Sequence, residues 1–509
     1  MNLARNNSTG STQSVFLESG SFQSITLGNL RLAPFTVEKV LDVQIKQQIN
    51  EHGTLFIKAM LPEGVEERDI EALSEHKTVA LLTGEQIIFQ GIAQEVEAIM
   101  VDHVYYLEIK AISYSYLLDI APVSCSFQNK KMTYHQLVSQ VTTKYPNASF
   151  IDTASNGKTT NQFIMAYKET DWQFLKRLAS HFNTGLICDT RFDSPKYFFG
   201  LPNQGVIDLE SFNYKAKKDL KRYKYLKESG MSGLSENDFI CYEVWTNQII
   251  QTGDRVRFKG VAYHVGNVVS QIKQGIFLSS CLLTTSQGLS QPYKPHDEIA
   301  GCSFNGRIID IQNDRVKVHL DIDPSQSVAD AHFFPYSTPY SSKDGSGWYA
   351  MPNMSDNVRI YFPDDDDSHA YAISSVHEPT TPAPTAQTSG GSGGSGGMNQ
   401  GGAAPPPSGA ARDNPDIKSL RHPSGKEITL TEEGIYIVDG TSSITMTEEG
   451  VVIQSEKDIE FKSDKDIIMS AEKKVQIVAQ ETVEICAGDT AKITLEENVE
   501  IQGQEVKSN

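Results

Sequence analysis

Residues 450–505 read GVVIQSEK, DIEFKSDK, DIIMSAEK, KVQIVAQE, TVEICAGD, TAKITLEE and NVEIQGQE, so the end of the chain has a period of eight. The second and fourth positions of the octads are apolar, and the sixth is small in six of the seven. Side chains two residues apart point to the same face of an extended strand. Each octad therefore predicts a short strand with one dry face, followed by a polar corner. The predicted core positions are Val451, Ile453, Ile459, Phe461, Ile467, Met469, Val475, Ile477, Val483, Ile485, Ile493, Val499 and Ile501.

A fixed short period of strand and turn is typical of a β-helix or another stacked array. A single chain winding on itself would need roughly three octads per turn and would make only about three turns, each advancing about 4.7 Å. Three chains wound around one axis would advance one strand spacing per octad, which gives a needle of roughly 33 Å. The trimer would also pair the strand edges along its length. We therefore expect an intertwined trimeric β-helix rather than an ordinary antiparallel sheet, which would show Gly or Asn turns and strands of uneven length.

A related repeat precedes the octads: ITLTEEG at 428–434 returns as ITMTEEG at 444–450. Gly434 and Gly450 stand at equivalent corners, where we expect a tight turn with positive φ. From residue 426 onward the chain has 8 lysines and 19 acidic residues. This acidic surface would keep an exposed strand stack soluble, and it argues against a nucleic-acid partner.

The composition of the whole chain excludes several classes of protein. Its 509 residues leave room for roughly three or four domains, and its net charge is −19. We expect no transmembrane helix, because no run of about 18 apolar residues occurs, and no secretory signal, because the start of the chain has no apolar core. The six cysteines are scattered without CxxC spacing. That spacing argues against a disulfide framework or a zinc ribbon and fits synthesis in a reducing cytosol.

The pattern of strands and helices predicts a mainly β chain in seven segments. Short alternating strands predict two β-barrels, with a hairpin around Gly84 in the first, and helices mixed with strands predict an α/β insert between the barrels. Five further strands, expected at 306–311, 315–320, 347–350, 357–362 and 370–376, fit an OB-type barrel. The expected segments are a flexible N-terminus at 1–14, the first barrel at 15–115, the insert at 116–230, the second barrel at 231–294, the OB-fold domain at 295–377, a Gly/Pro/Ser-rich linker at 378–418 and the needle at 419–509.

Two helices are expected in the insert. Thr133 with Gln136, and Thr170 with Gln173, each form the T-x-x-Q pattern of a capping box. The second box opens a helix with an apolar stripe at helical spacing, which we interpret as core rather than as a binding site. The stripe consists of Trp172, Leu175, Leu178 and Phe182.

Three stretches resemble one known family. The segment YKETDWQFLKRL at 167–178, followed by Gly185, resembles the hub signature of VgrG-type spike proteins and of the tailed-phage baseplate hub. The segments GRIID at 306–310, DRVKV at 314–318 and MPNMSDNVRIYF at 351–362 are similar to the OB domain of these spikes. The octads resemble their trimeric β-helix. The resemblance covers nearly the whole chain in the family's order, and it identifies the two barrels as hub barrels.

This resemblance implies a homotrimer at the tip of a contractile injection system, whether type VI secretion-like, phage-tail-like or an extracellular injection particle. Its hub would seat on a hexameric inner-tube protein and contact other baseplate components. Its needle would carry a PAAR-like tip protein, puncture a membrane and help to deliver effector cargo. The protein would assemble in the bacterial cytoplasm and be expelled from the cell on contraction. One departure is the length of the linker, and another is the lack of any His after His422, which removes the H-x-H iron site of some phage spikes.

No motif for catalysis, cofactor binding or metal binding stands out. H-E-x-x-H, a P-loop and Cys/His metal spacing are all missing. Four adjacent aspartates at 364–367 could attract calcium, but we interpret them as a solvated hairpin tip. We therefore expect a structural protein rather than an enzyme, with no cofactor. The alternatives are a β-helical polysaccharide-degrading enzyme, which needs clustered carboxylates along one groove, and a trimeric adhesin, which needs a secretion signal or an anchor.

Overall fold

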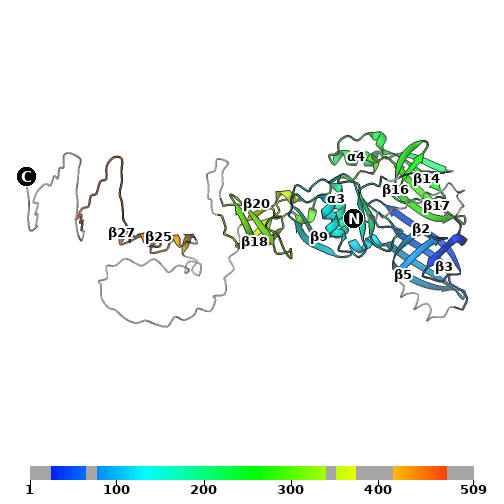
Figure 1. Cartoon of the computed structure of the whole chain (residues 1–509), viewed down its shortest axis with the longest axis horizontal. Helices are drawn as coiled ribbons and strands as arrows, with labels where there is room; N and C mark the ends of the chain where they lie inside the picture. The colour runs from blue at the N-terminus through cyan, green and yellow to red at the C-terminus, as the bar shows by residue number, and fades with distance from the viewer. Residues whose placement is uncertain are drawn as a thin grey trace, which may run out of the picture. The chain divides into compact units, whose positions relative to one another are not determined.

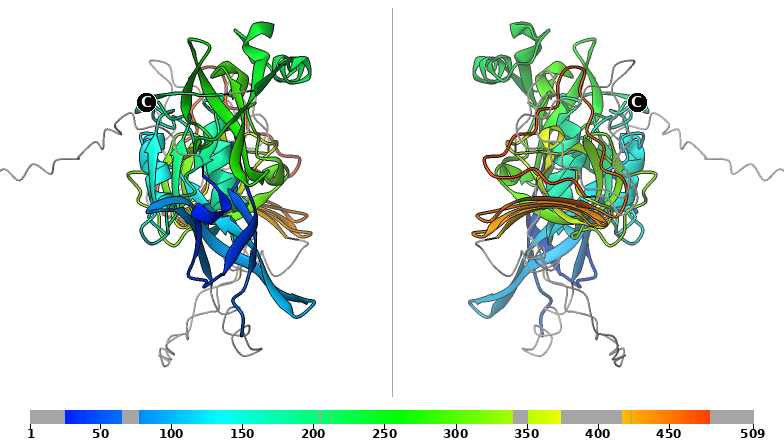
Figure 2. Two further views of the ribbon diagram at one scale, coloured as in Figure 1. Left: turned by 90° about the vertical axis from the view of Figure 1, so that its right-hand side faces the viewer. Right: turned by 90° about the vertical axis from the view of Figure 1, so that its left-hand side faces the viewer.

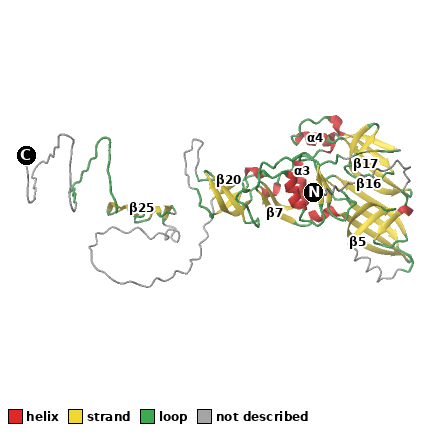
Figure 3. Cartoon of the chain, in the orientation of Figure 1, coloured by secondary structure: helices red, strands yellow, loops and turns green. Residues whose placement is uncertain are grey.

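The computed structural model of the chain describes residues 25–64, 77–203, 205–211, 213–339, 351–373, 417–422 and 424–478 (Figure 1). The chain divides into two compact units, 1–381 and 382–509. Among the described residues, the helices lie in the first unit and strands occur in both units, as the colouring by secondary structure shows (Figure 3). None of the helices in the described ranges is long and apolar enough to cross a membrane.

The two predicted barrels contribute to one 12-stranded sheet. Its first half has the order β1-β4-β5-β6-β3-β2, and its second half continues with β16-β17-β14-β13. In addition, β15 pairs with β16, and β12 pairs with β15. The strands are β1 (Leu30–Ala33), β2 (Lys39–Gln48), β3 (Thr54–Met60), β4 (Thr78–Thr83), β5 (Gln86–Val101), β6 (Val104–Ser113), β12 (Val206–Asp208), β13 (Asn213–Lys218), β14 (Ile240–Thr246), β15 (Arg255–Phe258), β16 (Val261–Lys273) and β17 (Ile276–Thr284).

The halves meet where β2 pairs antiparallel with β16, with Asn267 opposite Gln48 and Gln271 opposite Gln44. Each half has its own apolar core, because alternate residues of its strands point to one face. The hairpin expected around Gly84 is confirmed, and this glycine has a φ of 55° between β4 and β5. The closure of either half into a barrel stays a prediction.

The insert contains both predicted helices, α2 (Tyr134–Thr142) and α3 (Asp171–Ser180), and each begins at its expected capping box. Its strands are β7 (Pro122–Phe127), β8 (Ser149–Asp152), β9 (Ile164–Thr170), β10 (Leu186–Cys188) and β11 (Lys196–Phe199). A third helix, α4 (Leu220–Glu228), follows β13 and was not predicted.

The stripe of α3 is core, as predicted, because Trp172, Leu175 and Leu178 are fully buried. The indole N–H of Trp172 donates to the backbone oxygen of Asn50, 3.2 Å away, and so ties α3 to the turn between β2 and β3. Phe182 differs from the expectation, because it lies beyond the C-cap residue His181 and is only partly buried.

The OB-type region is a five-stranded antiparallel sheet in the order β20-β19-β18-β21-β22. The strands are β18 (Ser303–Gln312), β19 (Arg315–Leu320), β20 (Phe333–Pro335), β21 (Asn357–Tyr361) and β22 (Tyr371–Ile373). The strand expected at 347–350 lies outside the described residues, and β20 was not anticipated. The assignment of this sheet as an OB-fold stays a prediction.

In the second unit, five strands form an antiparallel meander. They are β23 (Lys418–Arg421), β24 (Lys426–Leu430), β25 (Gly434–Asp439), β26 (Ser442–Thr447) and β27 (Gly450–Ser455). The chain reverses between these strands where Gly425 and Gly440 have φ of 90° and 57°. The trimeric needle expected at 419–509 stays a prediction, because a single chain does not test an arrangement of three intertwined chains.

The two equivalent glycines of the meander play different roles. Gly450 has a φ of 145°, in the region that was predicted for it. Gly434 is not in the positive-φ region, and a Cβ placed on it would lie 2.3 Å from the backbone oxygen of Met446. The expectation of positive φ at Gly434 is therefore wrong, and a close approach of β26 explains the glycine instead.

Candidate functional site

The predicted needle core is exposed wherever the structure describes it. Eight of its positions fall in the described residues, and their side chains are between 47% and 69% exposed. These positions are Val451, Ile453, Ile459, Phe461, Ile467, Met469, Val475 and Ile477. The remaining five, Val483, Ile485, Ile493, Val499 and Ile501, lie outside the described residues. The single chain therefore leaves both apolar rows of its first octads open to water.

The corners of the first two octads have the same local geometry. The backbone N–H of Lys457 donates to Ser455 Oγ at 3.1 Å, and eight residues later the N–H of Lys465 donates to Ser463 Oγ at 3.2 Å. Serine hydroxyls form such local turns readily. In these two octads, the serine at the small sixth position thus closes the polar corner.

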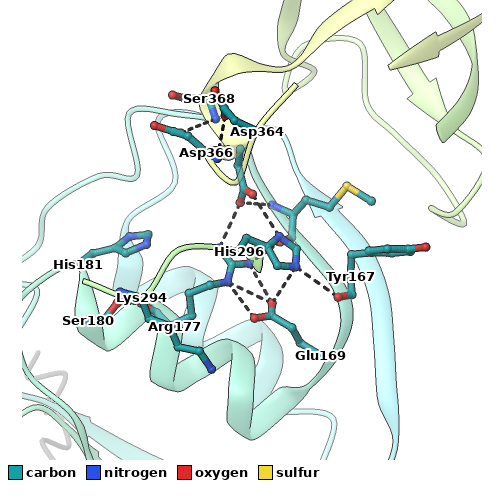
Figure 4. A network of polar contacts seen from close by, with 12 residues as sticks. Tyr167, Glu169, Arg177, Ser180, His181, Lys294, His296, Asp364, Asp366 and Ser368 are labelled. Carbon is teal, nitrogen blue, oxygen red and sulfur yellow. Dashed lines mark hydrogen bonds and ion pairs between the residues drawn. The ribbon is translucent and has the colours of Figure 1, made fainter. Parts of the chain in front are cut away.

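A second candidate site is a buried charge cluster where the insert meets the OB-type sheet (Figure 4). Arg177 of α3 lies at its centre, and its side chain is 2% exposed. Arg177 Nε donates to Glu169 Oε1 of β9 at 2.9 Å, and Nη1 donates to Asp367 Oδ2 at 3.2 Å. Asp367 belongs to the OB-type region, so the guanidinium joins two parts of the chain that are 190 residues apart.

His296 completes the cluster from the segment that leads into the OB-type region. Its Nδ1 lies 3.2 Å from Asp367 Oδ1, and its Nε2 lies 3.3 Å from the backbone oxygen of Tyr167. Asp367 also accepts a hydrogen bond from the backbone N–H of Met165 at 3.0 Å. The cluster as a whole therefore links the insert to the OB-type region.

The charges of the cluster stabilise one another. Burial acts to raise the pKa of Asp367, but the hydrogen bond from His296 and the charge of Arg177 hold this pKa below its ordinary value. Burial alone would lower the pKa of Arg177, and the two carboxylates raise it instead. Buried ions need this complete pairing, because a lone buried charge is very costly. The cluster can therefore hold the insert and the OB-type region together, but it leaves no free group for chemistry.

Apolar packing reinforces this joint. Phe163 and Met165 of the insert are buried in the same core as Phe334 and Phe362 of the OB-type region. Asp323 Oδ1 also accepts the backbone N–H of Ser126 at 2.8 Å. Sequence reasoning missed the joint because its members are scattered from residue 126 to residue 367. The one available signal was Arg177, a charged residue within the DWQFLKRL helix.

The four aspartates do not converge on a common point. Asp367 is turned into the charge cluster, whereas Asp364 Oδ2 lies 2.8 Å from the ring Nδ1 of His369. Asp366 accepts the backbone N–H of Ser368 at 2.9 Å. Within the described ranges, no three His, Cys, Asp or Glu side chains are grouped so that they could hold a metal ion. The calcium hypothesis for this loop therefore has no support among the described residues.

One contact resembles a hydrolytic triad in composition. His52 Nδ1 lies 2.8 Å from Ser115 Oγ, and its Nε2 lies 3.2 Å from Asp119 Oδ2. Burial lowers the pKa of His52, although Asp119 acts in the opposite direction. Ser115 is only 2% exposed, and its hydroxyl also contacts that of Ser113 at 2.9 Å. A substrate cannot reach a hydroxyl so deeply buried, so these side chains brace the turn beneath Trp172.

No family model matches the chain, and no curated protein matches it. The chain is, however, similar to several solved structures. The E. coli c3393 protein, a component of the type VI secretion system described as similar to the T4 tail proteins gp27 and gp5, is 12% identical, with 67% of this chain and 98% of that chain covered and a TM-score of 0.49. The half-lidded Francisella PdpA-VgrG complex is 9% identical, with coverages of 82% and 84% and a TM-score of 0.48.

A prophage MuSo2 tail protein from Shewanella oneidensis is 10% identical, with 52% of this chain and 98% of that chain covered and a TM-score of 0.39. Identities and TM-scores this low leave the function to be argued from the chain's own residues. These three solved structures are a type VI secretion component, a VgrG-containing complex and a phage tail protein, and the sequence motifs of this chain resemble the same class of protein.

Proposed function

We propose that this chain is the homotrimeric central spike and hub of a contractile injection apparatus. The observation that carries the proposal is the octad segment, where eight predicted core side chains are 47–69% exposed in one chain. Soluble proteins rarely leave such continuous apolar rows open to water. Two further copies, wound around the same axis, would cover the rows and pair their strand edges.

The first unit would act as the hub. Its sheets would seat on a hexameric inner-tube protein and contact the baseplate, while the second unit would extend toward the target and carry a PAAR-like tip protein. In this role the protein concentrates force on a narrow tip, punctures a membrane and helps to deliver effectors. It would be assembled in the bacterial cytoplasm and expelled on contraction.

The proposed role is mechanical rather than catalytic. A stack of three intertwined chains resists bending, because hydrogen bonds and packed Ile and Val layers run along its length. Load would pass from the OB-type region to the insert through the buried Arg177–Asp367 ion pair and the shared core around Phe163. The role requires neither a cofactor nor a nucleic-acid partner.

The mass of the full-length protein in solution tests this proposal. Sedimentation equilibrium should give about three times the 56.3 kDa of one chain, and negative-stain images should show a thin rod attached to a larger head. The trimer should persist in SDS without boiling, because its core would be dry. A mass of one chain at all concentrations would contradict the homotrimer and with it the spike.

A further inference from the structure

A strongly basic ridge stands out on this acidic chain. We define the basic ridge as β13 (Asn213–Lys218) together with α4 (Leu220–Glu228). Residues 213–228 contain seven Lys or Arg and two Asp or Glu, whereas the whole chain has a net charge of −19. Figure 2 shows the green helical segment near residue 220 projecting from the body of the first unit. The ridge is therefore a positively charged and accessible region on an otherwise acidic chain.

Two cations of the ridge hold the ridge itself in place. Arg222 Nε donates to the backbone oxygen of Gly288 at 3.0 Å, and Nη2 donates to that of Ser290 at 2.7 Å. Lys218 Nζ lies 2.7 Å from Glu236 Oε2. These contacts fix the ridge to the segment that follows β17 and to the segment that precedes β14, so the remaining cations project from a stable base.

The remaining cations are available to a partner. Lys215, Lys217, Lys221 and Lys224 are exposed, and none of them forms an ion pair among the residues that the structure describes. Lys218, and then Lys227 and Lys224, lower the pKa of Glu236, which shows that the cations of β13 and α4 share one neighbourhood. A partner would therefore meet several positive charges at once.

The ridge also has an open strand edge and apolar anchors. β13 is the last strand of the 12-stranded sheet, and all its pairings in the described residues are with β14. No described strand pairs with the other edge of β13, whose backbone groups could pair with an added strand. Tyr214, Leu220 and Tyr225 are 49%, 43% and 56% exposed among the lysines. Exposed aromatic and aliphatic side chains amid charge are typical of protein interfaces.

We propose that the basic ridge binds an extended acidic segment of a partner protein, which adds as a strand beside β13. The lysines of the edge repel basic or self-complementary edges, since a second β13 would bring like charges together. A strand bearing carboxylates instead gains both the main-chain hydrogen bonds and the charge pairs. Nucleic acid and anionic lipid could use the charge, but neither has the alternating donors and acceptors of a strand. The inference is independent of the proposed spike function.

Fluorescence anisotropy of a labelled, alternating Glu-Val octapeptide with the full-length chain tests the proposal. The peptide should bind, and its affinity should fall as salt rises. The double variant Lys217→Glu/Lys224→Glu should weaken binding by about tenfold or more. The matched control Lys131→Glu/Lys273→Glu changes the net charge equally at exposed lysines outside the ridge and should leave binding unchanged.

A second probe separates strand addition from charge alone. The same peptide, N-methylated at alternate residues, keeps its carboxylates but loses main-chain donors, and it should bind about tenfold more weakly. Equal binding of the two peptides would overturn strand addition. The whole proposal would fall if the octapeptide did not bind, if charge reversal in the ridge had no effect, or if single-stranded DNA or phosphatidylserine vesicles bound the ridge in its place.

Discussion

Two phenylalanines show that the two units of this chain differ in how far they bury apolar side chains. Phe163, in the joint between the insert and the OB-type sheet, is 1% exposed, whereas Phe461, in the second octad, is 66% exposed. The chain completes the joint by itself, with a shared core and paired charges from distant segments. The octad rows have no such cover within the described residues. The difference is that the joint is covered by residues of the same chain, whereas for the octad rows we propose cover by further copies of the chain.

The largest expected effect comes from a charge placed in the octad rows. Ile477→Asp would place three carboxylates in one dry layer of the proposed trimer, and burying unpaired charge is prohibitive. We expect complete loss of the SDS-resistant trimer on unboiled gels. The adjacent change Gln476→Asp adds the same group on the opposite side of the strand and should leave the trimer intact. A trimer that survives Ile477→Asp would show that the proposed register is wrong.

The next largest effect is expected at the joint between the insert and the OB-type region, which the chain completes by itself. Arg177→Met would leave Glu169 and Asp367 buried without their cation, which should cost about 3–5 kcal/mol of unfolding free energy. Urea unfolding of the full-length chain, followed by tryptophan fluorescence, measures this. Arg191→Met is the matched control, because the Arg191 side chain in its ion pair with Asp189 is 44% exposed, and it should cost about 1 kcal/mol or less.

Adding Asp367→Asn to the Arg177→Met variant sharpens that result. The second change removes one of the two stranded carboxylates, so the double variant should be more stable than Arg177→Met alone. If the double variant is less stable than the single one, Asp367 is held by contacts other than the guanidinium, and the joint does not depend on the charge cluster.

A smaller effect depends on pH and comes from His332, which is packed between Phe163 and Phe334 at the joint. Burial, with smaller contributions from Lys130 and Arg315, lowers the pKa of His332 from 6.5 to about 3. The unfolded chain therefore binds this proton more readily than the folded chain. The resulting stability is present above pH 6.5 and is lost as pH falls from 6.5 toward 3.

The variant His332→Phe would remove this proton linkage. Among the described residues, the Nδ1 of His332 has no hydrogen-bond partner, so the substitution removes no bond made by that atom. We expect a shallower loss of unfolding free energy with falling pH than in the unmodified chain, measured by urea unfolding at several pH values. His181, whose pKa is lowered to about 4 mainly by burial, should retain its own share of the acid sensitivity. Identical pH profiles for the two proteins would refute this role of His332.

The smallest effect is expected at the capping box of α2, which depends only on residues that are close in sequence. Thr133→Ala removes the hydroxyl that accepts the backbone N–H of Gln136 at 3.1 Å. Loss of such a cap costs about 1 kcal/mol, measurable by urea unfolding. Thr159→Ala, on the residue that bridges to Thr133, removes a hydroxyl that caps no helix and should have less effect. Equal costs would mean that the box does not stabilise α2.

Local patterns in the sequence predicted local structure well. The two capping boxes located the starts of α2 and α3, and the strand predicted at 315–320 coincides with β19. These features depend on neighbours within a few residues, which the sequence displays directly. Phe182 was misplaced because the apolar period continues past the residue where the helix ends.

Long-range features could not be predicted in the same way. The pairing of β2 with β16 merges the two expected barrels into one sheet, and no local signal marks either strand as the partner of the other. The charge cluster gathers Glu169, Arg177, His296 and Asp367 from four separate segments. The sequence shows Asp367 only as one of four adjacent aspartates. Its burial depends on contacts with residues that are distant in sequence.

The sequence by itself determined where this chain is periodic: the octads, their apolar rows and their small corners follow from residues a few positions apart. Only the tertiary structure decided which apolar surfaces the chain covers for itself. The physical reason is that periodicity sets which face of a strand is dry, whereas cover for that face comes from residues distant in sequence or from another chain. Other residues of the same chain bury Phe163, whereas Phe461 stays largely exposed among the described residues.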